Sequence, residues 1–179
     1  GSQRRELTDQ HLVEEWKSIR KQVPNFIALG NIGISQLIQT PVDQIKKLVD
    51  GLEASGLIVH LNALQEVLQI EGTPQFASGL KSIEALVKNF PVPVIIKETG
   101  CGFSENTLKQ LMETGVSAVD VGGYGGTHWG RIEGARAEDS KDLEKSYILS
   151  TAAHTFANWG VSTADSLKNA LAIKPNYEV

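Results

Sequence analysis

The chain has 179 residues, with 17 Lys and Arg against 21 Asp and Glu and a formal net charge of −4. Its basic residues are dispersed, which argues against a nucleic-acid partner or a polybasic membrane surface. No apolar run reaches the roughly 20 residues that span a bilayer, and the single cysteine, Cys101, excludes an internal disulfide framework. Without a recognisable signal peptide, we expect a cytoplasmic protein.

The first half of the chain alternates helical and strand patterns. Apolar residues at helical spacing predict a helix over residues 7–22, and residues 25–30 predict the first strand. Thr40-Pro41 predicts the start of the next helix, with Thr as N-cap and Pro at the first helical position. The β-branched run at 57–61 then predicts a buried strand, and residues 67–75 follow as a loop.

The second half continues the alternation. The predicted elements are a helix at 77–89, a strand at 92–96, a helix at 105–113, a strand at 118–121, a charged linker at 130–143 of a kind that is usually mobile or functional, and helices at 144–157 and 163–172. Residues 176–179 have the pattern of the beginning of another strand.

Strands that alternate with helices predict βαβ units and a parallel sheet, so the fold class is α/β. A (β/α)8 TIM barrel needs roughly 250 residues. We therefore expect residues 1–179 to form a single partial barrel domain, comprising about strands 3–6 with their flanking helices.

Polar residues follow the 57–61 strand, and the carboxyl ends of parallel strands are where such folds place their active sites. Glu66 is a suitable ligand for Mg²⁺, which binds one or two protein carboxylates and completes its shell with water and phosphate oxygens. The neighbouring amide of Gln65 can relay a proton if nearby groups stabilise its alternative form. A solvated loop carboxylate is the plain alternative for Glu66.

Two further strand ends carry candidate groups. Lys97 ends an apolar strand and could form a Schiff base, pair with a phosphate or lie against an electron-rich ring, or simply pair with Glu98. The glycine-rich loop Gly122–Thr127 can bring backbone N–H groups close to an anion or a flat ring. We interpret Cys101 as incidental, because no histidine is placed beside it in the sequence to activate it.

Three ordered motifs together resemble the type 2 isopentenyl diphosphate isomerases. They are His60-Leu-Asn-Ala-Leu-Gln-Glu66, Val94-Ile-Ile-Lys-Glu-Thr-Gly100 and Asp120-Val-Gly-Gly-Tyr-Gly-Gly-Thr-His-Trp129. The resemblance extends through Gly1-Ser-Gln-Arg4 and Asn31-Ile-Gly33 to nearly the whole chain, and it implies a flavoprotein of (β/α)8 fold. The implied reaction interconverts isopentenyl and dimethylallyl diphosphate in isoprenoid biosynthesis by protonation and deprotonation, with reduced FMN, Mg²⁺ and NAD(P)H as reductant.

The resemblance also implies roles for individual residues. Gln65 would be catalytic and Glu66 would hold the Mg²⁺. The remaining implied contacts are Ser2, Asn31, Lys97 and Thr127 to the flavin, and His60, Asn62, Gln65, Gln3 and Arg4 to the substrate. The family tends to form homo-tetramers or larger assemblies, and its partner is a small isoprenoid diphosphate.

The sequence also departs from the family pattern. The family's N-terminal diphosphate segment, its first flavin loop and its late phosphate loops lie outside these 179 residues, so we expect the chain to run from the end of strand two to the threshold of strand seven. Such a chain would by itself be a poor enzyme. His128 replaces a residue that is usually small and polar, and Gly122 replaces Ala or Ser.

Two other interpretations stay open at this point. An FMN-dependent 2-hydroxy acid oxidase or dehydrogenase shares the barrel and uses a His-x-x-Arg pair, which His128-Trp-Gly-Arg131 imitates. It would leave the Gln65-Glu66 pair unexplained. The other interpretation is an inactive fragment of the isomerase, which flavin binding would distinguish.

Overall fold

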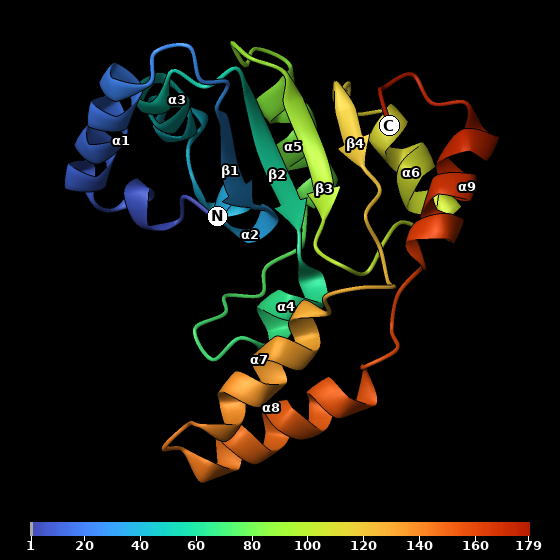
Figure 1. Ribbon diagram of the computed structural model, residues 1–179. Helices are drawn as coiled ribbons and strands as arrows, with labels where there is room; N and C mark the ends of the chain where they lie inside the picture. Colours follow the sequence, from blue (N-terminus) through green and yellow to red (C-terminus); the bar gives the residue numbers. More distant parts are fainter. Residues whose placement is uncertain (1) are drawn as a thin grey trace.

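A computed structural model describes residues 2–179, so Gly1 of the Gly1-Ser-Gln-Arg4 stretch lies outside the described residues. Four parallel strands form one sheet in the order β1-β2-β3-β4 (Figure 1). Their bounds are β1 (Leu29–Gly33), β2 (Gly56–Leu61), β3 (Val94–Glu98) and β4 (Ala118–Asp120). The predicted parallel α/β sheet is confirmed. The sequential order is that of a section of a β/α barrel, and closure into a TIM barrel stays a prediction.

Three helices cover one face of this sheet. Apolar residues of α3 (Val42–Leu52), α5 (Gly79–Val87) and α6 (Glu105–Met112) share one core cluster with residues of the strands. Within the described residues, no helix is long and apolar enough to cross a membrane. The other helical elements are η1 (Arg5–Leu7), α1 (Gln10–Gln22), α2 (Ile34–Gln39), α4 (Ala63–Leu68), α7 (Trp129–Glu138), α8 (Leu143–Thr155) and α9 (Thr163–Ile173).

The register of the strands divides their side chains into two faces. The covered face, which packs against α3, α5 and α6, includes the row Ile32, Val59, Ile96 and Val119, none of them more than 1% exposed. The open face carries the alternate residues. Its rows are Asn31, Ile58, Ile95 and Ala118, followed toward the carboxyl ends by Gly33, His60, Lys97 and Asp120. Ile58 and Ile95 are only partly buried.

The helices α4, α7 and α8 lie beyond the carboxyl ends of the strands (Figure 1). The prediction of a charged linker at 130–143 was wrong, because α7 occupies 129–138 and α8 begins at Leu143. Gly134 lets these two helices approach closely, since a Cβ at this position would lie 2.3 Å from Ala153 Cβ. The charged residues of this segment are exposed, except for Glu133.

Other boundaries also moved. The first strand begins at Leu29 instead of residue 25, where pairing with Gly56 starts. Helix α4 was not predicted, and α3 begins at Val42 with Pro41 as its N-cap. The predicted strand at 176–179 is present as a single parallel bridge between Glu178 and Ala118.

Candidate active site

A cavity of about 680 Å³ opens at the carboxyl ends of β1, β2 and β3. Its walls come from the open face, from α4 and from the residues before η1. Eight of the ten predicted site residues line it: Ser2, Arg4, Asn31, His60, Asn62, Gln65, Glu66 and Lys97. The fold therefore gathers residues that are up to 95 positions apart in the sequence, from Ser2 to Lys97, around one space.

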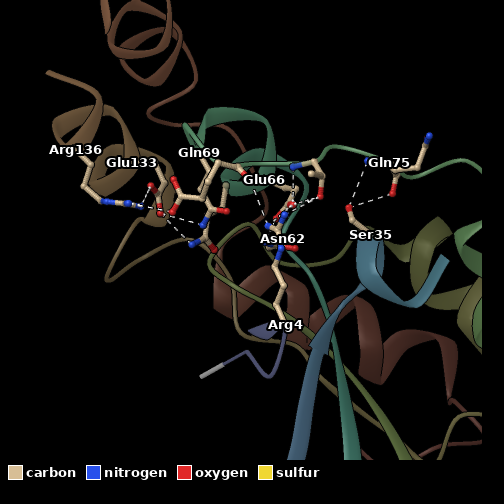
Figure 2. A network of polar contacts seen from close by, with 11 residues as sticks. Arg4, Ser35, Asn62, Glu66, Gln69, Gln75, Glu133 and Arg136 are labelled. Atoms are coloured by element: carbon tan, nitrogen blue, oxygen red, sulfur yellow. Dashed lines mark hydrogen bonds and ion pairs between the residues drawn. The ribbon is translucent and has the colours of Figure 1, made fainter. Parts of the chain in front are cut away.

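Glu66 lies at the centre of a set of hydrogen-bond donors (Figure 2). The residue is 3% exposed, and its Oε2 accepts a hydrogen bond from Asn62 Nδ2 at 3.1 Å. Its Oε1 accepts from the backbone N and from Oγ1 of Thr73, at 3.0 and 3.2 Å. Arg4 Nη1 lies 3.8 Å from the same oxygen. Both carboxylate oxygens of this buried residue therefore have hydrogen-bond donors.

His60 ends the open face beside Asn31 and Lys97. Its Nδ1 lies 2.9 Å from Asn31 Oδ1, and because that oxygen only accepts, the ring donates through Nδ1. Burial, followed by the charge of Lys97, lowers the pKa of His60 to about 4. The imidazole is therefore neutral at pH 7, with Nε2 as an acceptor. Gly33 leaves room here, since a Cβ would lie 2.4 Å from Gln36 Oε1 and 3.0 Å from that nitrogen.

The side chain of Gln65 is hydrogen-bonded to a residue that the sequence analysis did not single out. Glu133 of α7 is 3% exposed, and its Oε1 accepts from Gln65 Nε2 at 3.3 Å and from Gln69 Nε2 at 3.2 Å. Arg136 bridges Glu133 Oε2 at 2.5 Å and Glu71 Oε1 at 3.0 Å (Figure 2). Since Gln65 Nε2 points to Glu133, the carbonyl Oε1 remains for the cavity.

The network around Arg136 also fixes the charge of Glu71. A hydrogen bond from its own backbone and the Arg136 side chain lower the pKa of Glu71. Two acidic residues thus flank one arginine, and only Glu133 is buried. A signal for Glu133 was present in the sequence, because Arg136 follows it at the i,i+3 spacing of a helical ion pair.

Two predicted site residues lie outside the lining of the cavity. Gln3 is 5% exposed, and its backbone N donates to Asn31 O at 2.7 Å while its Oε1 accepts from Asn31 N at 3.0 Å. It therefore extends the edge of β1. Thr127 is exposed in the loop that follows β4. Their predicted contacts with substrate and flavin stay predictions.

The loop after β3 is organised by Glu98. Its Oε2 accepts from the backbone N of Thr99 at 2.7 Å and of Cys101 at 2.6 Å. Burial raises the pKa of Glu98 to about 7 although these N–H groups lower it, and burial followed by the charge of Glu98 raises the pKa of Cys101 to about 12. A thiol with that pKa stays protonated, in keeping with the interpretation of Cys101 as incidental.

The His128 and Arg131 pair, which imitates the His-x-x-Arg pair of the oxidases, makes structural contacts at the start of α7. His128 is the N-cap of α7, and its Nδ1 accepts from Arg131 N at 3.1 Å. The Arg131 side chain donates to Asn158 Oδ1 at 3.2 Å, and neither residue lines the 680 Å³ cavity. This geometry does not favour oxidation of a 2-hydroxy acid.

Comparison with known proteins gives consistent names. The chain is 56% identical over all of its 179 residues to the isopentenyl-diphosphate delta-isomerase of Bdellovibrio bacteriovorus, 50% of which it covers. It is 52% identical over 179 residues to the protein of that name from Legionella pneumophila strain Corby, covering 51% of it. Over 177 residues, or 98% of the chain, it is 37% identical to that of Ignicoccus hospitalis, covering 48% of it.

The chain thus spans about half the length of the curated relatives it matches. No family model matches the chain. The names of the relatives give the reaction as isomerisation of isopentenyl diphosphate and do not state which type of isomerase they are.

Proposed function

We propose that this chain forms the substrate-binding and proton-transferring part of a type 2 isopentenyl-diphosphate delta-isomerase. The observation that carries the proposal is the position of Gln65 beside Glu66 in one polar cavity, on a chain up to 56% identical to proteins named for this isomerisation. Type 2 is favoured by the three motifs at the ends of β2, β3 and β4, which resemble that type.

The diphosphate end of the substrate is recognised by charge. Arg4 supplies a guanidinium at the rim of the cavity, and its other contacts are the carbonyl oxygen of Glu71 at 3.4 Å and Thr73 Oγ1 at 3.5 Å. These weak contacts are easily exchanged for phosphate oxygens. Binding energy at this remote end then positions the alkene near Gln65.

The residues fit Mg²⁺ as a bridging ion. Among the described residues there is no group of three or more His, Cys, Asp or Glu side chains that could enclose a metal. Mg²⁺ does not need such a group, because it takes one or two carboxylates and fills its shell with water and phosphate oxygens. Glu66, which is buried in the cavity wall, would hold it. The ion would neutralise part of the diphosphate charge.

The proton chemistry belongs to Gln65. Isomerisation adds a proton to one end of the three-carbon alkene unit and removes one from the other end, so the double bond moves without net oxidation. Gln65 lines the cavity, and its Oε1 can accept the proton that the substrate loses while Nε2 passes one to Glu133 Oε1. The reverse of this relay can supply the proton that the substrate gains. In this scheme Glu133 keeps the amide oriented and holds the proton that Nε2 passes on.

The open face fits a flavin. Lys97 and Asn31 line the cavity from neighbouring rows of the sheet, and Ser2 lies at its rim, so these residues would hold the FMN together with Thr127. When bound in its reduced form, FMN supplies an electron-rich ring that stabilises positive charge on the substrate. The Lys97 ammonium favours an anionic ring beside it.

The test is conversion of isopentenyl to dimethylallyl diphosphate, with reduced FMN and Mg²⁺, by the full-length protein of which this chain forms part. We expect Gln65→Asn to lower kcat by about 10²–10⁴-fold, the usual contribution of a positioned acid or base. Gln110→Asn, an exposed residue of α6, is the matched control and should leave kcat unchanged. Equal activity of the two variants, or oxidation of lactate or glycolate instead, would contradict the proposal.

A further inference from the structure

A second, much smaller cavity lies between α4, the N-terminus of α7 and the loop after β3. It measures about 10 Å³, which is room for one water molecule. Asn62, Gln65, Thr99, Cys101 and His128 are among its lining residues. Two side-chain atoms, Asn62 Oδ1 and His128 Nε2, are buried without a hydrogen-bond partner among the described residues. Both belong to residues that line this one cavity.

The chemistry of its neighbour fixes the orientation of the Asn62 amide. Nδ2 lies 3.1 Å from Glu66 Oε2, and a carboxylate oxygen only accepts, so the NH2 group must be on this side. The carbonyl Oδ1 is therefore turned away from Glu66. The residue is 4% exposed, so this oxygen is an acceptor that bulk water does not reach.

The hydrogen position on His128 follows in the same way. Its Nδ1 lies 3.1 Å from the backbone N of Arg131, which only donates, so Nδ1 carries a lone pair. Burial and the nearby charge of Arg131 lower the pKa of His128, and the neutral ring then carries its hydrogen on Nε2. His128 is 9% exposed, so Nε2–H is a buried donor. Gly130 encloses the ring, because a Cβ there would lie 2.9 Å from His128 Cε1.

We propose that this cavity binds one structural water molecule, which accepts a hydrogen bond from His128 Nε2 and donates one to Asn62 Oδ1. One buried donor and one buried acceptor in a one-water cavity match the two functions of water. Leaving both groups unpaired in the protein interior would be unfavourable. The water connects the N-cap of α7 to Asn62 and, through Asn62 Nδ2, to Glu66.

His128 thereby becomes a positioning residue that acts through the water. The bridge holds the Asn62 amide with Nδ2 toward Glu66 and opposes rotation of the side chain by 180°. His128 is one of the positions where this sequence departs from the family pattern, which usually has a small polar residue there. A smaller side chain would not extend as far toward Asn62. The water site does not depend on the proposed isomerase activity, so either proposal can fail alone.

The first experiment is a crystal structure of the unmodified protein at about 1.5 Å resolution. We expect an ordered water within about 2.7–3.2 Å of both His128 Nε2 and Asn62 Oδ1. A dry cavity, or a water that contacts only one of the two atoms, would overturn the proposal. Nitrogen-15 NMR of the histidine rings provides an independent check, since His128 must be the Nε2–H tautomer at pH 7 and the Nδ1–H tautomer would also overturn it.

The matched variant is His128→Asn. The Asn Oδ1 can replace Nδ1 as the acceptor for Arg131 N, so the helix cap is kept while Nε2 is removed. We expect the melting temperature to fall by roughly 2–4 °C and the Asn62 side-chain NH2 resonances to shift. His154→Asn, an exposed residue of α8, should change neither. Unchanged Asn62 resonances in His128→Asn would show that the bridge does not position this amide.

Discussion

The two faces of the sheet differ although they are built from the same strands. On the covered face, Val59 and Ile96 are fully buried under α3, α5 and α6. On the open face, the preceding residues of the same strands, Ile58 and Ile95, are only partly buried, and polar residues follow them in the next row of that face. His60 and Lys97 of that row line the large cavity.

This difference assigns stability and chemistry to opposite sides of one backbone. A parallel sheet normally has both faces covered. Here the covered face holds the strands in register, and this rigid support fixes the direction in which the open-face side chains point. The strongest effects on folding should therefore come from the covered face, and the strongest effects on turnover from the open face and the residues behind it.

Adjacent isoleucines in β3 provide the largest expected effect. Ile96→Ala removes a fully buried side chain from the core cluster and should lower the free energy of unfolding by about 2–5 kcal/mol. Ile95→Ala changes the same residue type one position earlier, on the open face, and should cost clearly less. Urea unfolding of the two variants measures both values, and equal losses would refute the division into two faces.

The carboxyl end of β3 gives the second prediction, which concerns pH. The pKa of Glu98 is raised from 4.5 to about 7, so between these pH values the unfolded chain releases a proton that the folded chain keeps. Stability therefore falls as pH rises through this window, by roughly 3 kcal/mol. The loss is complete about one pH unit above the folded-state pKa.

His60 on the open face works in the opposite direction. Its pKa is lowered from 6.5 to about 4, so the folded chain stays neutral where the unfolded chain takes up a proton, and stability falls as pH decreases through that window. The two groups nearly cancel between pH 4.5 and 6.5, and the stability of the unmodified protein should be flat there as far as they determine it.

Glu98→Gln separates the two contributions. Both backbone N–H groups donate to Oε2 of Glu98, so a single amide oxygen can replace it. We expect the variant to become more stable as pH rises from 4 to 6.5, because only the His60 contribution remains. Urea unfolding at a series of pH values tests this, and a pH profile parallel to that of the unmodified protein would contradict the assignment.

The third prediction concerns the residue behind Gln65. Glu133→Gln replaces the carboxylate that accepts a hydrogen bond from Gln65 Nε2 with a neutral amide. We expect kcat for the proposed isomerisation to fall about tenfold, which corresponds to roughly 1.4 kcal/mol of activation free energy. Glu138→Gln, at the exposed end of the same helix, is the matched control. An unchanged kcat in Glu133→Gln would remove this residue from the mechanism.

Much of the site was predictable because it follows from strand ends. The apolar runs at 57–61 and 92–96 indicate buried strands, and the parallel order then brings Glu66 and Lys97 to the same edge. The start of β1 was not predictable in this way, since the apolar residues Phe26 and Ile27 precede it and are 53% and 76% exposed. The register depends on pairing with β2, which is a property of the folded sheet.

Glu133 was missed for a related reason. Helix α7 buries glycine and alanine against α8, so it has no large apolar stripe that would mark it as a helix in the sequence. The contact of Glu133 with Gln65 joins residues 68 positions apart. The backbone pairing of Gln3 also had no sequence signal, because its Oε1 accepts from Asn31 N, 28 positions away, and its contact with substrate stays a prediction.

The smallest expected effect tests the covered face at its edge. Ser104 is the N-cap of α6, and its Oγ accepts from Thr107 N at 3.2 Å. Ser104→Ala should lower the free energy of unfolding by about 1 kcal/mol, while Ser104→Asp keeps the acceptor and should be nearly neutral. Thr127→Ala, on an exposed loop beyond the open face, should stay within about 0.5 kcal/mol. If Ser104→Ala loses more unfolding free energy than Thr127→Ala, then the helices of the covered face determine stability, and proximity to the cavity does not. A larger loss in Thr127→Ala would show that the open side also supports the fold.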